Sequence, residues 1–343
     1  MKILLIGGTG TISTAITALL ASRVKAGMSC DEIWVLNRGN RSGVLPEGVH
    51  RIIADAYDKD SLAKAVDGLD FDVVCFFIGF DVNQVAVVHD VFTGRIGQFV
   101  YISSASAYRK PPVGYLITED TPLENPFWEY SRKKIACEEY LMDKYRTEGF
   151  PVTIIRPSHT YCERSVPVGM HGANGSWQVL KRMMEGRPVI VHGDGSSLWT
   201  MTDSRDFAVA FTGLLGKSEA IGQAFHITSD ESIPWNQIYS EIAWALSEAL
   251  GRTITPVLHH VASDRIVEEA RAFGYDMEGN LIGDKSNSVV FDNSKVKSVV
   301  PAFGAQVSHR EGTLRAVKYI LAHPELQKED PQFDAFCDHL ARL

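Results

Sequence analysis

The chain opens with an apolar strand, a glycine-rich turn and a helix, and this order restricts the fold more than any other feature. Residues 2–6 form a continuous apolar run, which is typical of a strand buried on both faces of a parallel sheet. The turn over residues 7–13 reads Gly-Gly-Thr-Gly-Thr-Ile-Ser. Apolar side chains then recur at helical spacing, and Gly27 is a suitable helix stop. The sequence therefore predicts a strand, turn and helix at the start of a parallel sheet.

The glycine turn also points to a ligand. Unpaired N–H groups at such a helix start, together with the helix dipole, favour a pyrophosphate. Ser13 stands where a dinucleotide fingerprint usually has Gly or Ala, and its small side chain still lets helix and strand pack closely. Glycine-rich turns also occur for structural reasons alone. We predict a dinucleotide site whose contacts are Gly7, Thr9, Gly10, Thr11 and Ile12.

The end of the second predicted strand, residues 32–36, bears on the choice of cofactor. A site for NAD normally ends this strand with an acidic residue that binds the ribose hydroxyls. Here the position is Asn37, and Arg38 and Arg41 follow it. Two guanidinium groups beside a neutral amide suit a 2′-phosphate, which favours NADP over NAD. The alternative is that both arginines are solvated loop residues.

Further apolar runs alternate with helical stretches. The predicted strands cover residues 51–54, 71–78 and 98–102, and the predicted helices cover residues 59–66 and 83–92. This alternation predicts right-handed βαβ units in one parallel sheet, whose ligands bind at the carboxyl ends of the strands. Asp55 ends the third strand near the expected adenine edge, although it is also a suitable helix cap or turn residue. Ser104 follows the fifth strand.

Tyr130 and Lys134 lie four residues apart in a stretch of helical composition, residues 128–142, so they share one face of a helix. A neighbouring ammonium, with a cofactor ribose bridging to it, is sufficient to lower the pKa of a tyrosine. Ser104 would hold and polarise the substrate oxygen. A tyrosine and a lysine at this spacing occur by chance in many exposed helices. Their position after a serine-rich strand end indicates a site for proton transfer.

Three further stretches complete the pattern: Ile-Arg-Pro-Ser-His-Thr-Tyr at 155–161, Val-His-Gly-Asp-Gly at 191–195, and Arg-Asp-Phe-Ala at 205–208. With the motifs above, the chain resembles the extended short-chain dehydrogenase/reductase superfamily, in its NAD-dependent epimerase/dehydratase branch, from residue 1 to about 301. The resemblance implies an α/β, Rossmann-type doubly wound parallel sheet, a smaller C-terminal substrate-binding region and a homodimer. It implies these site residues: Ser104, Tyr130 and Lys134 as the catalytic group, Lys134 also on the cofactor ribose, and Pro157 and His159 along the nicotinamide.

The resemblance leaves the substrate open. Many nucleotide-sugar members of the branch place a basic residue, which contacts the diphosphate, where this chain has Trp199. An indole offers area for a sugar ring but no positive charge, and it is equally suited to a core. Arg205 could replace the missing cation. The candidate substrate contacts are Ser104, Tyr161, His171, Trp199 and Arg205.

Composition sets wider bounds. The 343 residues are 45% hydrophobic, which suits a dinucleotide-binding core over residues 1–165 and a mainly substrate-binding region over residues 166–343, with some segments returning to the core. A net charge of −8 argues against broad binding to nucleic acid or an anionic membrane. Five cysteines without C-x-x-C spacing suggest reduced thiols in the cytoplasm. The histidines show no metal-binding spacing, so we expect no metal site.

These features predict an NAD(P)-dependent oxidoreductase or epimerase that acts on a secondary hydroxyl or ketone of a sugar or sugar-nucleotide. The sequence does not choose between epimerase, dehydrogenase, reductase and dehydratase. The alternative is a non-catalytic dinucleotide-sensing or RNA-interacting protein on the same fold, because sequences of this kind also resemble plant chloroplast nucleic-acid-binding proteins. The presence of Ser104, Tyr130 and Lys134 argues against that alternative.

Overall fold

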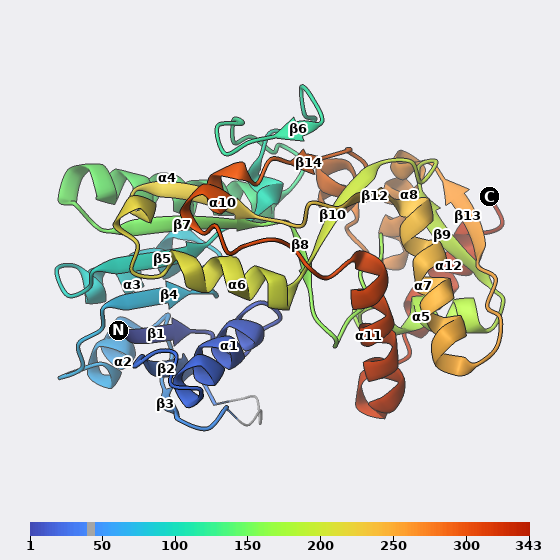
Figure 1. The fold of residues 1–343 in the computed structure, drawn as a ribbon. Coiled ribbons are helices and arrows are strands. Elements are labelled where there is room, and N and C mark those ends of the chain that lie inside the picture. Colours follow the sequence, from blue (N-terminus) through green and yellow to red (C-terminus); the bar gives the residue numbers. More distant parts are fainter. Residues whose placement is uncertain (40–44) are drawn as a thin grey trace.

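The computed structural model describes residues 1–39 and 45–343, which form a sheet-centred body and a smaller body beside it (Figure 1). Within the described residues, the central sheet has seven strands in the order β11-β7-β5-β4-β1-β2-β3, and all neighbouring strands are parallel. The strands are β1 (Lys2–Ile6), β2 (Glu32–Asn37), β3 (Val49–Ile53), β4 (Val73–Phe76), β5 (Gln98–Ile102), β7 (Val152–Pro157) and β11 (Gln223–Ile227).

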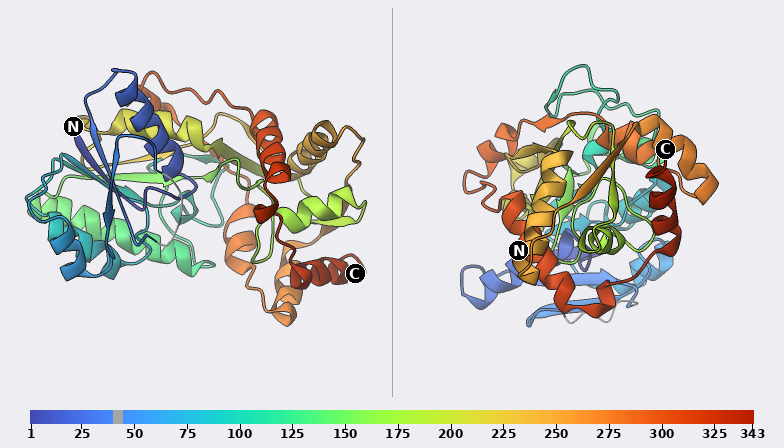
Figure 2. Two further views of the ribbon diagram at one scale, coloured as in Figure 1. Left: turned by 90° about the horizontal axis from the view of Figure 1, so that it is seen from below. Right: turned by 90° about the vertical axis from the view of Figure 1, so that its right-hand side faces the viewer.

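Helices cover both faces of this sheet, as the left view of Figure 2 shows. One face carries α1 (Ser13–Lys25), α6 (Ser204–Leu214) and α10 (Ser294–Val299). The other face carries α2 (Lys59–Ala65), α3 (Val82–Phe92) and α4 (Glu129–Glu148). Because both faces are covered, the central strands are apolar throughout, and β4 and β5 are buried along their whole length. The predicted doubly wound parallel sheet is confirmed.

The glycine turn follows β1 at the carboxyl edge of the sheet. Gly7 has a φ of +92°, a conformation that L side chains rarely adopt. Gly8 lies against β2, where an added Cβ would meet Val35 Cγ2 at 2.8 Å. The turn therefore needs glycine at both positions, once for backbone conformation and once for space.

The smaller body is built almost entirely from the second half of the chain (Figure 1). A three-stranded sheet, β12-β10-β8, and a two-stranded sheet, β13-β9, pack with helices around an apolar core. Its strands are β8 (His159–Tyr161), β9 (Pro188–His192), β10 (Leu198–Asp203), β12 (Ser232–Pro234) and β13 (Val257–Val261). Its helices are α5 (Trp177–Met184), α7 (Trp235–Leu250), α8 (Ser263–Ala270), α11 (His309–Ala322) and α12 (Pro331–Leu340). The short pair β6 (Leu116–Ile117) and β14 (Val290–Phe291), and the turn α9 (Glu278–Asn280), lie near the junction with the sheet-centred body.

Three segments after residue 165 return to the sheet-centred body: α6, β11 and α10. β11 pairs with β7 in parallel and forms one edge of the central sheet. Helix α4 is longer than the sequence indicated and ends at Gly149, whose φ is +70°. The helices α5, α8 and α12 were not predicted. Helix α12 begins where the Asp330 side chain accepts a hydrogen bond from the Phe333 N–H.

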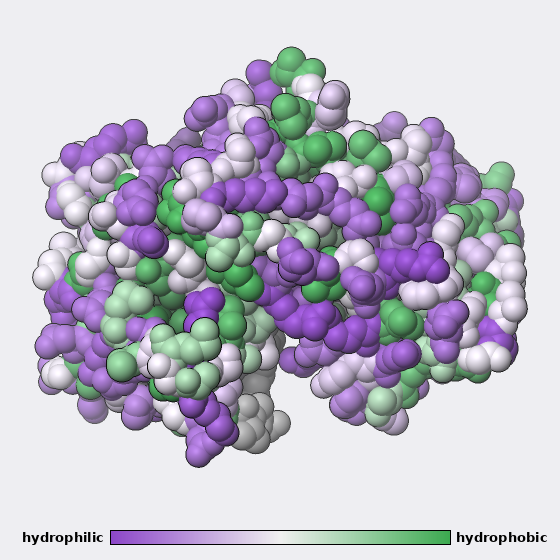
Figure 3. Space-filling view, in the orientation of Figure 1, coloured by the Kyte–Doolittle hydropathy of each residue, from purple (hydrophilic) through white to green (hydrophobic). Residues whose placement is uncertain are grey.

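The surface mixes polar and apolar side chains, and a notch separates the two bodies on the lower side of the view (Figure 3). Hydrophobic side chains gather on the projecting segment around β6, where Val113, Tyr115 and Leu116 are exposed. Among the described residues, no helix combines the length and the apolar character that a bilayer crossing needs. The five cysteines are free thiols, and only Cys30 is exposed.

Candidate active site

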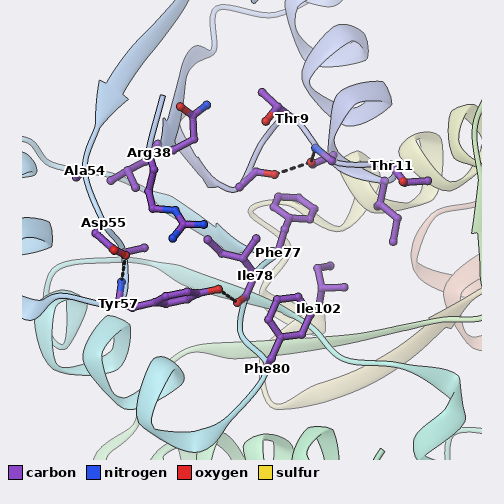
Figure 4. A pocket seen from close by; sticks show the side chains of 17 residues that line it. Thr9, Thr11, Arg38, Ala54, Asp55, Tyr57, Phe77, Ile78, Phe80 and Ile102 are labelled. Atoms are coloured by element: carbon purple, nitrogen blue, oxygen red, sulfur yellow. Dashed lines mark hydrogen bonds between the residues drawn. The ribbon is translucent and has the colours of Figure 1, made fainter. Parts of the chain in front are cut away.

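A cavity of about 470 Å³ lies at the carboxyl ends of β1 to β4 (Figure 4). The structure brings together here eight of the residues predicted for the cofactor: Gly7, Thr9, Gly10, Thr11, Ile12, Asn37, Arg38 and Asp55. It adds others that were not among the predicted cofactor contacts, such as Ser13, Ala54, Tyr57, Phe77, Ile78, Phe80 and Ile102. Arg41 lies outside the described residues.

The hydrogen bonds of the glycine turn suit an anion. Ser13 Oγ donates to the Gly7 carbonyl at 2.7 Å and accepts from the Gly10 N–H at 2.8 Å, so this serine fixes the turn from within. Among the described residues, the N–H groups of Thr11, Ile12 and Ser13 donate to no protein acceptor. These donors lie at the positive end of α1, which is the arrangement that binds phosphate groups in dinucleotide sites. The residues present therefore fit a pyrophosphate.

The two polar side chains at the end of β2, Asn37 and Arg38, point in different directions. Asn37 Oδ1 accepts from the Gly39 N–H at 3.0 Å, so this amide braces its own turn. The Arg38 guanidinium extends into the cavity (Figure 4). A guanidinium in the cavity, with no acidic residue at the strand end, suits a negatively charged group on the ribose.

The opposite wall of this cavity is formed by the segment after β3. Asp55 Oδ1 accepts from the Tyr57 N–H at 3.0 Å, and Tyr57 Oη donates to the Ile78 carbonyl at 2.6 Å (Figure 4). The Asp55 carboxylate is thus partly used by the turn, as the alternative interpretation of this residue anticipated. Tyr57 ties the turn after β3 to the segment after β4, and a tertiary contact of this kind leaves no local sequence signal.

Ser104, Tyr130 and Lys134 come together beside the cavity. Ser104 follows β5, while Tyr130 and Lys134 lie on the first turns of α4. The Ser104 and Tyr130 side chains line the same cavity, and the Ser104 hydroxyl lies near enough to the phenol to affect its pKa. Lys134 Nζ donates to the carbonyls of Gly79 at 2.6 Å and Ile102 at 2.8 Å, and lies 5.8 Å from the centre of the Tyr130 ring. These two bonds leave one of the three ammonium hydrogens for another acceptor.

The protonation states of Tyr130 and Lys134 differ from those that the sequence predicted. Burial raises the pKa of Tyr130, and this effect exceeds the opposing effect of the nearby Ser104 hydroxyl. Burial also lowers the pKa of Lys134 to about 8. The lysine does not lower the tyrosine pKa here, because its ammonium is turned toward two backbone carbonyls. At neutral pH Tyr130 is therefore a neutral phenol, which is the form that donates a proton.

A hydrogen-bond network holds Ser104 from behind. Ser104 Oγ lies 2.8 Å from Ser106 Oγ, which accepts from Ser131 Oγ at 2.8 Å. Asn125 Nδ2 donates to the Ser106 carbonyl at 2.8 Å. Ser131 lies on α4, so the network fixes the Ser104 hydroxyl relative to the helix that carries Tyr130.

A second cavity, of about 300 Å³, lies on the other side of Ser104 and Tyr130. Pro157 and His159, which the resemblance placed along the nicotinamide, line this second cavity, as does Trp199. Trp199 is only 3% exposed, and its Nε1 donates to His159 Nδ1 at 3.3 Å. Burial lowers the pKa of His159 to about 3, so its ring is neutral and Nε2 carries the remaining hydrogen. Trp199 is thus both a core residue and a wall of the cavity.

Three predicted substrate contacts, Tyr161, His171 and Arg205, are absent from the lining of this cavity in the described part of the chain. The Arg205 side chain is exposed and bonds Asp203, which caps the start of α6. Tyr161 is buried against Gly312, and His171 Nδ1 lies 2.7 Å from the Gly172 carbonyl. In their place the cavity contains three charged residues that the sequence did not single out: Lys110, Asp284 and Lys285.

Comparison with known proteins relates this site to an enzyme family. Residues 82–228, which include Ser104, Tyr130 and Lys134, match the model of the NAD dependent epimerase/dehydratase family. Over these residues the chain is similar to this family. It is an enzyme, and the resemblance to the epimerase/dehydratase branch that its motifs predicted is confirmed.

Individual relatives are distant. The chain is 26% identical to 2'-dehydrokanamycin reductase of Streptomyces kanamyceticus over 75% of its own length and 69% of that protein. It is 24% identical to the chloroplast stem-loop binding protein of 41 kDa b of Arabidopsis thaliana over 80% of its length and 70% of that protein. Its fold matches the structure of dTDP-glucose 4,6-dehydratase from Bacillus anthracis in complex with NAD, with a TM-score of 0.71 and 18% identity over 95% and 98% of the two chains. Enzymes that act on sugars thus recur among its relatives.

Proposed function

We propose that this enzyme interconverts a secondary hydroxyl and a ketone on a sugar or sugar-nucleotide, as an NAD(P)-dependent oxidoreductase or epimerase. The observation that supports this proposal most is the arrangement of two cavities around one strand end. Ile102 lines the cavity with the glycine turn, and Ser104, two residues later, lines the cavity with Tyr130. A group held in the first cavity and a sugar in the second would meet at the Ser104 and Tyr130 hydroxyls.

The proposed cofactor is NADP or NAD, with NADP favoured by Arg38. The N–H groups at the start of α1 would hold its pyrophosphate, Arg38 a 2′-phosphate, and the remaining N–H of Lys134 a ribose hydroxyl. When bound, the nicotinamide supplies or takes up a hydride.

The protein's own residues handle the proton. In the direction of ketone reduction, Tyr130 Oη donates its proton to the substrate oxygen while Ser104 Oγ hydrogen-bonds that oxygen. Lys134 would act on the resulting phenolate only through a bound cofactor, whose ribose, held by the remaining N–H, would bridge the ammonium to Tyr130. In the direction of oxidation the phenolate takes the hydroxyl proton back. Burial raises the pKa of Tyr130, so the phenol is protonated at neutral pH. Before turnover the enzyme therefore holds the proton that ketone reduction needs.

Replacing Arg38 by alanine tests the cofactor preference. We expect NADP to bind more weakly by roughly 1–3 kcal/mol, the range for a lost charged hydrogen bond, with a smaller loss for NAD. Arg265→Ala, which removes an exposed arginine in the smaller body, is the matched control and should change neither affinity. Equal losses for both dinucleotides by calorimetry, or far tighter binding of NAD by the unmodified enzyme, would contradict the preference.

The pH dependence of ketone reduction should follow Lys134. Its pKa of about 8 means that the ammonium is present below this pH and lost above it, whereas Tyr130, with its raised pKa, stays protonated over the same range. We therefore expect kcat/KM to fall as the pH rises above about 8. In Lys134→Arg, whose side chain remains charged, this fall should move to higher pH. An unmoved fall in that variant would show that another group controls it.

The dinucleotide recovered from the purified protein distinguishes the two modes of action. Mass spectrometry of the denatured enzyme should find retained NAD(P) if hydride returns to the same substrate, as in epimerisation. An empty site would indicate cofactor exchange, as in a reductase or dehydrogenase.

A second function deserves a test because one relative is named as a stem-loop binding protein. Under this alternative the chain would bind RNA or sense a dinucleotide without chemistry. The net charge of −8 opposes contact with a phosphate backbone. Micromolar binding of a stem-loop RNA at 150 mM salt, without any hydride transfer, would favour it.

The proposed homodimer is tested separately by light scattering.

A further inference from the structure

The second cavity contains charges that the proton transfer does not use. Lys110 Nζ lies 3.7 Å from a carboxylate oxygen of Asp284, and Lys285 Nζ donates to Asn280 Oδ1 at 2.7 Å. Lys110 is 4% exposed and Lys285 is 6% exposed. No other lining residue in the described part of the chain carries a charge, since the His159 ring is neutral. Lys110 and Asp284 balance each other, so Lys285 gives the cavity a net charge of +1.

The fold fixes Lys285 at the cavity wall. The segment Leu281–Lys285 forms a π-helical turn, an irregular form that often occurs at functional sites. The Lys285 carbonyl accepts from Ser197 Oγ at 3.0 Å and Trp235 Nε1 at 3.3 Å, and lies 3.2 Å from His192 Nε2. Several side chains of the smaller body therefore hold this backbone in place, and they would still do so after a change of the Lys285 side chain.

A buried ammonium that no carboxylate contacts is costly to a protein. Among the described residues, no carboxylate contacts the Lys285 ammonium: Asp284 attracts it only from beyond ion-pair distance, and its single hydrogen-bond acceptor is a neutral amide. Burial accordingly lowers the pKa of Lys285 to about 8, which still leaves it charged at pH 7. A structural lysine of this kind would normally be paired. Its position on the wall of an open cavity, next to the proton-transfer residues, suggests that a ligand provides the missing anion.

We propose that the second cavity binds a sugar that carries one carboxylate, a hexuronate or related sugar acid, and that Lys285 pairs with that carboxylate. This inference rests on the proposed function, whose substrate class it narrows. One negative charge matches the net charge of the cavity, whereas an amino sugar would add a second unpaired cation. The indoles of Trp128 and Trp199 provide apolar walls for a sugar ring. The cavity of about 300 Å³ is at the lower end of the range for ligand pockets, which suits a monosaccharide.

The test measures binding rather than turnover. Calorimetry in saturating NADP would compare D-galacturonate with D-galactose, D-galactosamine and D-galactose 6-phosphate, and repeat the comparison in the gluco series. We expect the hexuronate to bind at least about tenfold more tightly than the neutral hexose, the effect of one charge-assisted hydrogen bond. Lys285→Met should remove this preference and Lys285→Arg should keep it. Lys217→Met, at an exposed surface lysine, is the control and should leave it unchanged.

Each other outcome overturns the inference. It fails if the hexuronate binds no better than the hexose, if the sugar phosphate or the amino sugar binds most tightly, if no probe binds, or if Lys285→Met keeps the preference. If Lys285→Met does not fold, Lys110→Met becomes the deciding variant. It frees Asp284 to pair with Lys285, so the preference for the hexuronate should be lost. Failure of the proposed function is distinguishable, because a hexuronate could bind selectively and yet undergo no hydride transfer.

Discussion

Replacing Tyr130 with phenylalanine is expected to lower turnover by roughly 10²- to 10⁴-fold, the range for loss of a positioned proton donor. Phenylalanine keeps the ring that packs near Lys134 and removes only the hydroxyl, which lines the second cavity together with Ser104. The affinity for NAD(P) should change little, because Tyr130 lines the second cavity and not the one with the glycine turn. Steady-state kinetics and dinucleotide titration on the same preparation measure both effects.

Tyr140→Phe is the matched control for this variant. Tyr140 lies on the same helix, and its hydroxyl contacts His89 at 3.3 Å, away from both cavities. Activity should therefore be retained in Tyr140→Phe. Near-normal activity of Tyr130→Phe on an authentic substrate would remove Tyr130 from the proton-transfer role.

The largest effect on stability should come from Arg156→Met. Arg156, on β7, donates from Nε and Nη2 to the Glu138 carboxylate of α4, at distances from 2.6 to 3.1 Å. Arg156 is 6% exposed and Glu138 is 2% exposed, so the substitution would leave a buried carboxylate without a partner. We expect the free energy of unfolding in urea to fall by about 3–5 kcal/mol.

A double variant separates the value of the ion pair from the cost of an unpaired charge. In Arg156→Met combined with Glu138→Leu, most of the lost stability should return, because apolar side chains often replace a buried ion pair at little cost. Lys133→Met breaks an exposed ion pair on the same helix and should change stability little. If the double variant is as unstable as Arg156→Met alone, the hydrogen bonds of Arg156 to Tyr108 and Glu119 carry the effect instead.

The sheet-centred body was predictable because its signals are local. Residues 2–6 are continuously apolar since helices cover both faces of the sheet, and Gly7 is required by its positive φ. Parallel topology then brings the strand ends together, which is why the glycine turn, Arg38 and Ser104 were identified from sequence alone. Their roles in binding and catalysis remain predictions.

The second cavity was harder to predict because distant segments form it. Lys110 and Lys285 stand in irregular segments 175 residues apart, and neither belongs to a recurring motif. Arg205 was proposed from its position in a family motif, but the Asp203 cap holds its guanidinium elsewhere. Sequence spacing likewise placed Lys134 next to Tyr130 without showing that the carbonyls of Gly79 and Ile102 engage its ammonium.

Deuterium transfer from the cofactor to a sugar tests the central claim most directly. The enzyme, freed of any retained dinucleotide, would be loaded with NADPH or NADH deuterated at either face of nicotinamide C4 and mixed with keto-sugars, including keto-uronates. We predict that mass spectrometry finds one deuterium on the carbinol carbon of the product, transferred from one face of the nicotinamide only. In Tyr130→Phe this transfer should be at least about a hundredfold slower. Absence of transfer to every keto-sugar while the dinucleotide is bound, or equal transfer by the two proteins, would contradict the proposed function.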